Sequence, residues 1–195
     1  MTSVTLRPAV FLDRDGVIIE NRADYVKSLA EVQFIPGALT ALARLARHNL
    51  LIVIVTNQSA IGRGIVARET VDAINAYVVG QIVSAGGRVD ALYLCPHHPQ
   101  DGCACRKPAP GMLLEAARDL DIDLAASVMI GDALTDVQAA EAVRVEPILV
   151  LTGLGSAQVH WWTPAQNPLL TVPDLAAAVE QILNENRSLT KTPPE

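Results

Sequence analysis

Short apolar runs of strand length recur along the chain and alternate with segments of helical period. The runs are nearly continuous rather than alternating, which is typical of strands buried on both faces of a parallel sheet. Five such strands are predicted, at Ala9–Leu12, Leu50–Val55, Val89–Leu94, Ser127–Ile130 and Ile148–Leu151.

Apolar residues three and four positions apart predict helices between these strands. The positions are Leu39, Leu42 and Ala46; Val71, Ile74, Val78 and Ile82; Leu113, Ala116, Ala117 and Leu120; and Leu175, Val179 and Ile182. Pro36 and Pro110 precede two of these helices, where proline suits the first turn. The alternation of strand and helix predicts an α/β fold with a doubly wound, Rossmann-like parallel sheet.

Length and composition narrow the class of protein. The 195 residues suit one domain, and a chain that is 50% hydrophobic and 18% charged excludes extensive disorder. The net charge of −6 disfavours a nucleic-acid partner or an anionic membrane surface. No secretory signal or bilayer-length apolar run is present. We therefore expect a cytoplasmic, monomeric protein with one domain over residues 1–195 and a flexible polar tail from about Asn184.

Polar residues gather where predicted strands end, which is the edge at which open α/β sheets bind ligands. After the first strand, Asp13 and Asp15 stand two residues apart, so both side chains point the same way, and Gly16 allows a sharp turn. Two close carboxylates need a cation or a shared proton, and an aspartate can also attack phosphorus. Taken alone, the pair suits a polar turn equally well.

Three further motifs follow in order. Thr56-Asn57 closes the second strand, Lys107 precedes a predicted helix, and Gly131-Asp132 is followed by Asp136 where the fourth strand gives way to a helix. Each motif alone has an ordinary explanation as a turn, a surface charge or a helix cap. Together with the aspartate pair, in this order and at these strand ends, they resemble the phosphatases of the haloacid dehalogenase superfamily over about residues 11–140.

The resemblance implies a catalytic role for four residues. Asp13 would be the nucleophile that accepts the phosphoryl group. Asp15 would protonate the leaving alcohol and then activate the water that hydrolyses the aspartyl-phosphate. Thr56 and Lys107 would bind the transferring phosphoryl oxygens, which need fixed donors in the transition state.

The resemblance also implies a magnesium cofactor. Its ligands would be the carboxylates of Asp13 and Asp132 and the backbone carbonyl of Asp15, since Mg²⁺ prefers hard oxygen ligands. Asp136 would lie behind them and hold Lys107 or a metal-bound water.

The space between the motifs leaves no room for an independent cap domain, so we expect a capless fold. The loops expected to frame the substrate are Asn21–Val26, Ser59–Gly64 and His97–Arg106. Arg63 and Arg106 would bind a second phosphate or sugar hydroxyls, because guanidinium groups suit bidentate phosphate contacts. The amide of Asn57 would also contact the substrate.

All three cysteines lie in one loop, from Cys95 to Cys105, together with His97 and His98. Three thiols cannot all pair within one chain, and disulfides are rare in the cytosol. Three thiolates and one imidazole complete a tetrahedral zinc set, and a closed set is structural rather than catalytic. The expected ligands are Cys95, His97, Cys103 and Cys105, with His98 as the alternative histidine; incidental surface cysteines are the other interpretation. Bound zinc would stiffen the loop that carries Arg106 and Lys107.

The zinc loop narrows the resemblance to two groups, the heptose bisphosphate phosphatases and the histidinol-phosphate phosphatases. The segment TNQSAIGRG, residues 56–64, looks like the corresponding segment of the heptose group, with Ala60 in place of its glycine. The resemblance therefore favours Mg²⁺-dependent hydrolysis of the C7 phosphate of a heptose 1,7-bisphosphate, a small phosphorylated sugar. Histidinol phosphate is the alternative substrate, and a zinc-stabilised binding module without catalysis is the alternative from another class.

Both tryptophans of the chain stand together in His160-Trp161-Trp162. We expect this segment to pack the C-terminal part of the chain onto the core. An interaction surface is the alternative, because exposed apolar patches often mark contacts with partners.

Overall fold

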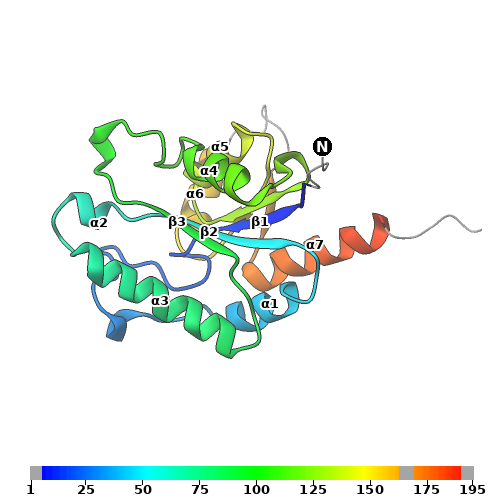
Figure 1. Cartoon of the computed structure of the whole chain (residues 1–195), viewed down its shortest axis with the longest axis horizontal. Helices are drawn as coiled ribbons and strands as arrows, with labels where there is room; N and C mark the ends of the chain where they lie inside the picture. The colour runs from blue at the N-terminus through cyan, green and yellow to red at the C-terminus, as the bar shows by residue number, and fades with distance from the viewer. Residues whose placement is uncertain (1–5, 163–168, 190–195) are drawn as a thin grey trace, which may run out of the picture.

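Six parallel strands form one sheet in the order β3-β2-β1-β4-β5-β6 (Figure 1). The computed structural model describes residues 6–162 and 169–189, with side chains described up to residue 184. The strands are β1 (Ala9–Leu12), β2 (Leu51–Asn57), β3 (Ala91–Cys95), β4 (Val128–Gly131), β5 (Glu146–Val150) and β6 (Leu170–Val172).

Helices cover both faces of this sheet. They are α1 (Ala38–Leu45), α2 (Ser59–Gly62), α3 (Arg68–Ser84), α4 (Gly111–Leu120), α5 (Leu134–Glu141), α6 (Gly155–Gln158) and α7 (Leu175–Leu189). Figure 1 shows α1, α3 and α7 on one face and α4 and α5 on the other. Short 3₁₀ turns occur at Leu29–Glu31, Pro99–Asp101, Leu124–Ala126 and Val159–Trp161. No helix among the described residues is both long and apolar enough to cross a membrane.

The central strand β1 shows why its sequence is continuously apolar. Val10 and Leu12 pack into the core under α1, α3 and α7. Ala9 and Phe11 pack into the second core under α4 and α5. Because successive side chains of a strand point to opposite faces, a strand covered on both sides needs apolar residues at every position.

The strand order creates a ligand-binding edge beside β1. This strand pairs in parallel with β2 on one side and β4 on the other, with Leu12 level with both Ile54 and Ile130. The strands β2 and β3 are added on one side of β1 and β4 to β6 on the other, and such a reversal of strand order opens a crevice beyond the carboxyl ends of the strands. The motif residues that follow β1, β2 and β4 therefore meet at one place.

The predicted α/β fold with a parallel sheet is confirmed, and all five predicted strands are present, the first with the predicted bounds and the other four with shifted ends. Thr56 and Asn57 belong to β2 rather than to the loop after it. The sequence analysis missed β6, because a strand of three residues gives no periodic signal.

Near the C-terminus, the flexibility of the tail from about Asn184 stays a prediction, whereas the expected packing of Trp161 onto the core is wrong. The last helix continues past Asn184 to Leu189, where glutamate, arginine and leucine are good helix formers although the segment is polar. Residues 190–195 of the predicted tail lie outside the described residues. Trp161 is 78% exposed and therefore does not pack onto the core, whereas Trp162 beside it is half-buried.

Candidate functional site

A cleft of about 270 Å³ opens at the carboxyl ends of β1, β2 and β4. Six of the predicted active-site and metal-site residues line it, namely Asp13, Asp15, Asn57, Lys107, Asp132 and Asp136. The rim includes Arg63 and Arg106 together with residues of the loop Asn21–Val26. The structure thus brings together side chains that are up to 123 positions apart in the chain.

Gly16 makes the tight turn after the aspartate pair possible. Its φ of +84° lies in the left-handed region, and its backbone N–H donates to the carbonyl of Ile19 at 2.7 Å. A Cβ at this position would lie 2.0 Å from Oδ2 of Asp132. Glycine is therefore required both for the backbone conformation and for the close approach of the Asp132 carboxylate.

Asp132 follows β4 directly and is wedged between two glycines. A Cβ at Gly153 would also lie 2.0 Å from Oδ2 of Asp132, and this oxygen accepts the backbone N–H of Leu154 at 2.8 Å. Asp13, Asp132 and Asp136 each offer a carboxylate oxygen within 4.8 Å of the others. This is a donor set of the hard oxygen type that Mg²⁺ prefers.

Lys107 lies among these carboxylates with a side chain that is 1% exposed. Its Nζ lies 2.6 Å from Oδ1 of Asp136 and 3.1 Å from Oδ1 of Asp13, and it donates to the carbonyl of Val55 at 2.8 Å. Burial alone would lower the pKa of Lys107, but the charges of Asp13 and Asp136 raise it well above its ordinary value. The residue is therefore a permanent buried cation.

Burial has the opposite effect on two of the carboxyl groups. It raises the pKa of Asp13 to about 6, with Asp136 and Asp15 adding to the shift and Lys107 opposing it. It raises the pKa of Asp132 to about 8, and the charges of Asp13 and Asp136 contribute further. Like charges at close range disfavour full ionisation, so the cluster without a metal holds its protons more strongly than free aspartates do.

Asp136 performs two tasks from the first turn of α5. Oδ2 accepts the backbone N–H of Ala133 at 3.1 Å and caps the helix, while Oδ1 contacts Lys107. The ordinary explanation of this residue as a helix cap and the expected contact with Lys107 both hold.

Asn57 lines the cleft whereas Thr56 does not, and both residues contact other parts of the site. The Asn57 amide donates to the Lys107 carbonyl and accepts the Lys107 N–H, both at 3.1 Å. The hydroxyl of Thr56 accepts a hydrogen bond from Nε2 of Gln58 at 2.9 Å, and the residue is only 1% exposed. Asn57 thus fixes the backbone that carries Lys107.

Sequence reasoning missed two residues that surround Asp15. Nη2 of Arg14 donates to both carboxylate oxygens of Asp15, at 3.0 and 2.8 Å. Nε2 of Gln58 donates to Oδ2 of Asp15 at 2.7 Å. The arginine lies between the two motif aspartates in the sequence, so its position alone could have drawn attention to it.

The rim of the cleft is basic although its floor is acidic. Arg63 is exposed and forms no ion pair with the described residues. One guanidinium nitrogen of Arg106, Nη1, is buried without a hydrogen-bond partner in the described part of the chain. Both guanidinium groups are therefore available for an anionic ligand.

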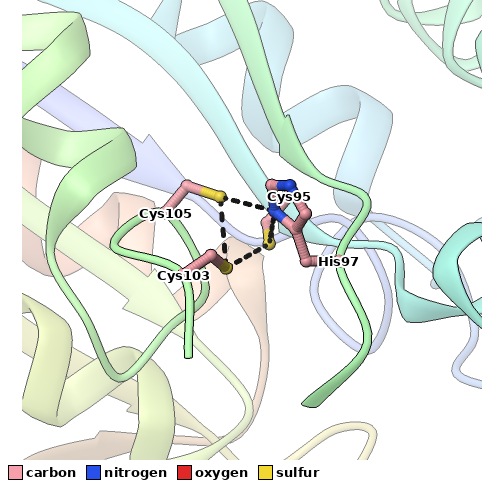
Figure 2. Close-up of side chains that lie close together, drawn as sticks. All are labelled: Cys95, His97, Cys103 and Cys105. Carbon is pink, nitrogen blue, oxygen red and sulfur yellow. Dashed lines mark hydrogen bonds between the residues drawn. The ribbon is translucent and has the colours of Figure 1, made fainter. Parts of the chain in front are cut away.

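A second cluster lies beside the cleft and consists of Cys95, His97, Cys103 and Cys105 (Figure 2). The sulfur atoms of Cys95 and Cys103 lie 3.6 Å apart, those of Cys103 and Cys105 3.5 Å apart, and Nδ1 of His97 lies 3.2 Å from the Cys105 sulfur. The separations exceed a disulfide bond of about 2.05 Å. They are close to the ~3.8 Å edge of a tetrahedron with zinc–sulfur bonds of about 2.3 Å.

The proximity of the three thiols affects their protonation when no metal is bound. Burial and the neighbouring thiols raise the pKa of Cys105 to about 12, so three adjacent thiolates do not form in the metal-free cluster. The cluster contains His97, whereas Nδ1 of His98 accepts the N–H of Gln100 at 3.3 Å and caps a 3₁₀ turn. Of the two histidines considered from the sequence, the structure places His97 among the thiols.

Glycine contacts hold this loop against the rest of the fold. The N–H of Gly62 donates to the carbonyl of Pro96 at 2.8 Å, and the N–H of Gly111 donates to the carbonyl of Ala104 at 3.0 Å. A Cβ at Gly111 would lie 2.2 Å from that carbonyl oxygen. The loop that leads to Lys107 is therefore packed on both sides.

The chain is similar to a known protein family and to individual proteins of known name. Residues 104–178 match a family profile described as HAD-hydrolase-like. The D-glycero-beta-D-manno-heptose-1,7-bisphosphate 7-phosphatase of Bordetella bronchiseptica is 43% identical over 180 residues, which cover 90% of this chain and 98% of the relative. The enzyme of the same name from Pseudomonas aeruginosa is 38% identical over 91% of this chain and 98% of its own length.

Solved structures agree with these sequence matches. The crystal structure of D,D-heptose 1,7-bisphosphate phosphatase from B. bronchiseptica, complexed with magnesium and phosphate, has a TM-score of 0.87, 42% identity, and covers 91% of this chain and 99% of that one. The corresponding enzyme from Burkholderia thailandensis has a TM-score of 0.69 and 34% identity, with the same coverage. The chain belongs to the family of D-glycero-beta-D-manno-heptose-1,7-bisphosphate 7-phosphatases within the haloacid dehalogenase-like hydrolases.

Proposed function

We propose that this protein is a Mg²⁺-dependent phosphatase that removes the C7 phosphate of D-glycero-D-manno-heptose 1,7-bisphosphate through an aspartyl-phosphate intermediate. The observation that carries the proposal is the Asp13 carboxylate at the cleft floor, paired with a buried Lys107 and two further carboxylates. Family membership supports the choice of substrate.

Asp13 is the proposed nucleophile. Its Oδ1 accepts the N–H of Arg14 at 2.8 Å and contacts Lys107, whereas Oδ2 accepts no hydrogen bond from the described residues. The free oxygen can form a bond to phosphorus while the bond from phosphorus to the C7 oxygen breaks. Water then attacks the aspartyl-phosphate at phosphorus, releases phosphate and regenerates the carboxylate.

Asp15 is the proposed general acid and base. Its side chain is 21% exposed and lines the cleft, so it can reach a bound ester. In the first step it gives a proton to the departing C7 oxygen, and in the second it takes a proton from the attacking water.

Lys107 stabilises the phosphoryl oxygens by its charge. A hydrogen bond to the substrate would replace its 3.1 Å contact with Asp13, the longest of its three contacts. Thr56 would donate its hydroxyl proton to a phosphoryl oxygen, since in its hydrogen bond with Gln58 the hydroxyl oxygen is only the acceptor. Asn57 contributes indirectly, because its amide positions the Lys107 backbone.

The acidic cluster fits a magnesium ion. Asp13 and Asp132 would hold it, together with the backbone carbonyl of Asp15, while Asp136 remains with Lys107. Bound Mg²⁺ would neutralise the carboxylates and so allow a phosphate dianion to approach them.

Arg63 and Arg106 are the proposed contacts for the second phosphate. Both line the cleft, and the unpartnered Nη1 of Arg106 lacks an acceptor that a phosphate oxygen could provide. A substrate with two phosphates would thus use both the acidic floor, through the metal, and the basic rim.

The thiol and imidazole cluster fits a structural zinc ion. Cys95, His97, Cys103 and Cys105 supply four ligands and leave no position for water, so zinc would stabilise the loop rather than take part in the reaction. The loop ends at Arg106 and Lys107, and its stiffness would fix both side chains.

Phosphate release with Mg²⁺ tests the activity and the substrate. We expect a higher kcat/KM for heptose 1,7-bisphosphate than for histidinol phosphate, because the second phosphate meets the basic rim. Asp13→Asn should lower kcat by roughly three orders of magnitude or more. A preference for histidinol phosphate would contradict the substrate assignment, and undiminished release by Asp13→Asn would contradict the nucleophile.

The raised carboxyl pKa values predict how magnesium stabilises the fold. An unfolded aspartate ionises near pH 3.9, so the metal-free protein loses stability as pH rises toward the folded pKa values of about 6 and about 8. Mg²⁺ binds the ionised cluster and should raise the melting temperature more at about pH 9 than at about pH 5. Melting curves of the zinc-loaded protein, with and without Mg²⁺, measure this effect.

The matched variants for that experiment are Asp132→Asn and Asp119→Asn. Asp132→Asn should abolish most of the Mg²⁺ stabilisation, whereas Asp119→Asn, at an exposed carboxylate on α4, should keep it. An Mg²⁺ effect that is equal at both pH values, or that survives in Asp132→Asn, would contradict the metal assignment.

Neighbouring histidines provide a matched test of the zinc site. The purified protein should contain about one zinc ion per chain. His97→Asn should lose most of the zinc and lower the melting temperature, because structural metal binding contributes to folding. His98→Asn should keep both, since asparagine can replace the cap that His98 provides. Equal zinc content in the two variants would count against His97 as the ligand.

A further inference from the structure

Arg14 is a fully buried arginine that contacts Asp15, and the proposed reaction gives it no role. The residue is 1% exposed and is among the largest fully buried side chains of the protein. It does not line the cleft, so it does not touch a bound substrate. Its side chain lies between Asp15 and helix α3, where Nη1 donates to Oδ1 of Asn75 at 2.6 Å.

The guanidinium group of Arg14 binds the carboxylate of Asp15. Nη2 donates to both carboxylate oxygens, and Gln58 adds a third hydrogen bond at 2.7 Å. Gln58 is itself fixed, because its backbone N–H donates to the carbonyl of Cys95 at 2.8 Å. The Asp15 carboxylate thus has two side-chain donors anchored on different elements, α3 and the β3 end.

Stability alone does not account for this arrangement. Taking a guanidinium group out of water is costly, and a well-packed apolar side chain is often as stable as a buried ion pair. Nε of Arg14 and Nδ2 of Asn75 are moreover buried without a partner among the described residues, which adds to the cost. Such incomplete pairing points to a role in fixing the geometry of Asp15.

We infer that Arg14, anchored by Asn75, is a positioning residue that orients the Asp15 carboxylate toward the oxygen of the departing alcohol. This inference rests on the proposed function, in which Asp15 transfers the proton. Among the described residues, the side chains that restrain the Asp15 carboxylate are Arg14, which Asn75 holds in place, and Gln58.

Phosphate esters with different leaving groups distinguish a loss of Asp15 positioning from a general loss of activity. An alkyl phosphate needs a proton on its leaving oxygen, whereas 4-nitrophenolate departs without one. Arg14→Met should therefore lower kcat/KM for heptose 1,7-bisphosphate at least about tenfold more than for 4-nitrophenyl phosphate. The ratio of kcat/KM values is the informative quantity, because it reports the steps up to loss of the leaving group.

Two further variants connect the effect to the contacts of Arg14. Arg14→Lys keeps a cation beside Asp15. Its ratio of kcat/KM for heptose 1,7-bisphosphate to kcat/KM for 4-nitrophenyl phosphate should therefore lie between the ratios of Arg14→Met and the wild type. Asn75→Ala leaves Asp15 untouched but frees the guanidinium group, and it should move the ratio in the same direction by a smaller factor. Asn75→Ala also serves as the test if Arg14→Met does not fold.

Arg88→Met is the matched control for loss of a structural arginine. Arg88 donates to the carbonyl of Ala46 and pairs with Asp90 at the opposite end of the sheet. This variant should lower the melting temperature without changing the ratio between the two esters.

Three results would overturn the inference. Arg14→Met could lower kcat/KM for both esters by one factor, or leave both values unchanged, or Asn75→Ala could leave the ratio at the wild-type value. In each case the proposed function would still stand, provided that the wild-type enzyme hydrolyses heptose 1,7-bisphosphate. A wild-type protein that hydrolyses neither ester would overturn the proposed function together with the inference.

Discussion

The cleft depends on the ion pairs of the Lys107 ammonium group, because this group lies between carboxylates that repel one another. Its contacts with Asp13 and Asp136 are 3.1 and 2.6 Å long, and its side chain is 1% exposed. Two unit charges at about 4 Å interact by roughly 4 kcal/mol at an effective dielectric constant of about 20. An attraction of this size can offset the mutual repulsion of the carboxylates and the loss of hydration.

The position of Lys107 is in turn fixed by parts of the fold outside the cleft. Its backbone is held by the amide of Asn57 at the end of β2, and its loop carries three of the four donors of the thiol and imidazole cluster nearby. Gly111 packs against the carbonyl of Ala104 in the same loop. The cluster, the loop and the strand end therefore act together to set one charged atom beside Asp13.

Sequence reasoning located the residues whose position follows from strand ends. Asp13 and Asp132 come directly after apolar strands, and a parallel sheet brings such positions to one edge whatever their separation in the chain. The cysteine loop was equally visible, because its donors lie within eleven residues. The contacts of Arg14 and Gln58 were not predictable, since they depend on how far α3 and the end of β3 lie from Asp15. The exposed Trp161 shows the same limit, because hydrophobicity alone does not tell whether a given ring packs onto the core.

A double-mutant cycle between Lys107 and Asp136 tests the balance of charge most directly. Urea unfolding without Mg²⁺ at about pH 7 gives the free energy of unfolding of the wild type, Lys107→Met, Asp136→Asn and the double variant. We expect Lys107→Met to lose about 3–5 kcal/mol, because it leaves buried carboxylates unpaired. The double variant should be at least about 1 kcal/mol more stable than the sum of the single losses predicts. Losses that add to within about 0.5 kcal/mol would show that Lys107 does not hold the carboxylates together.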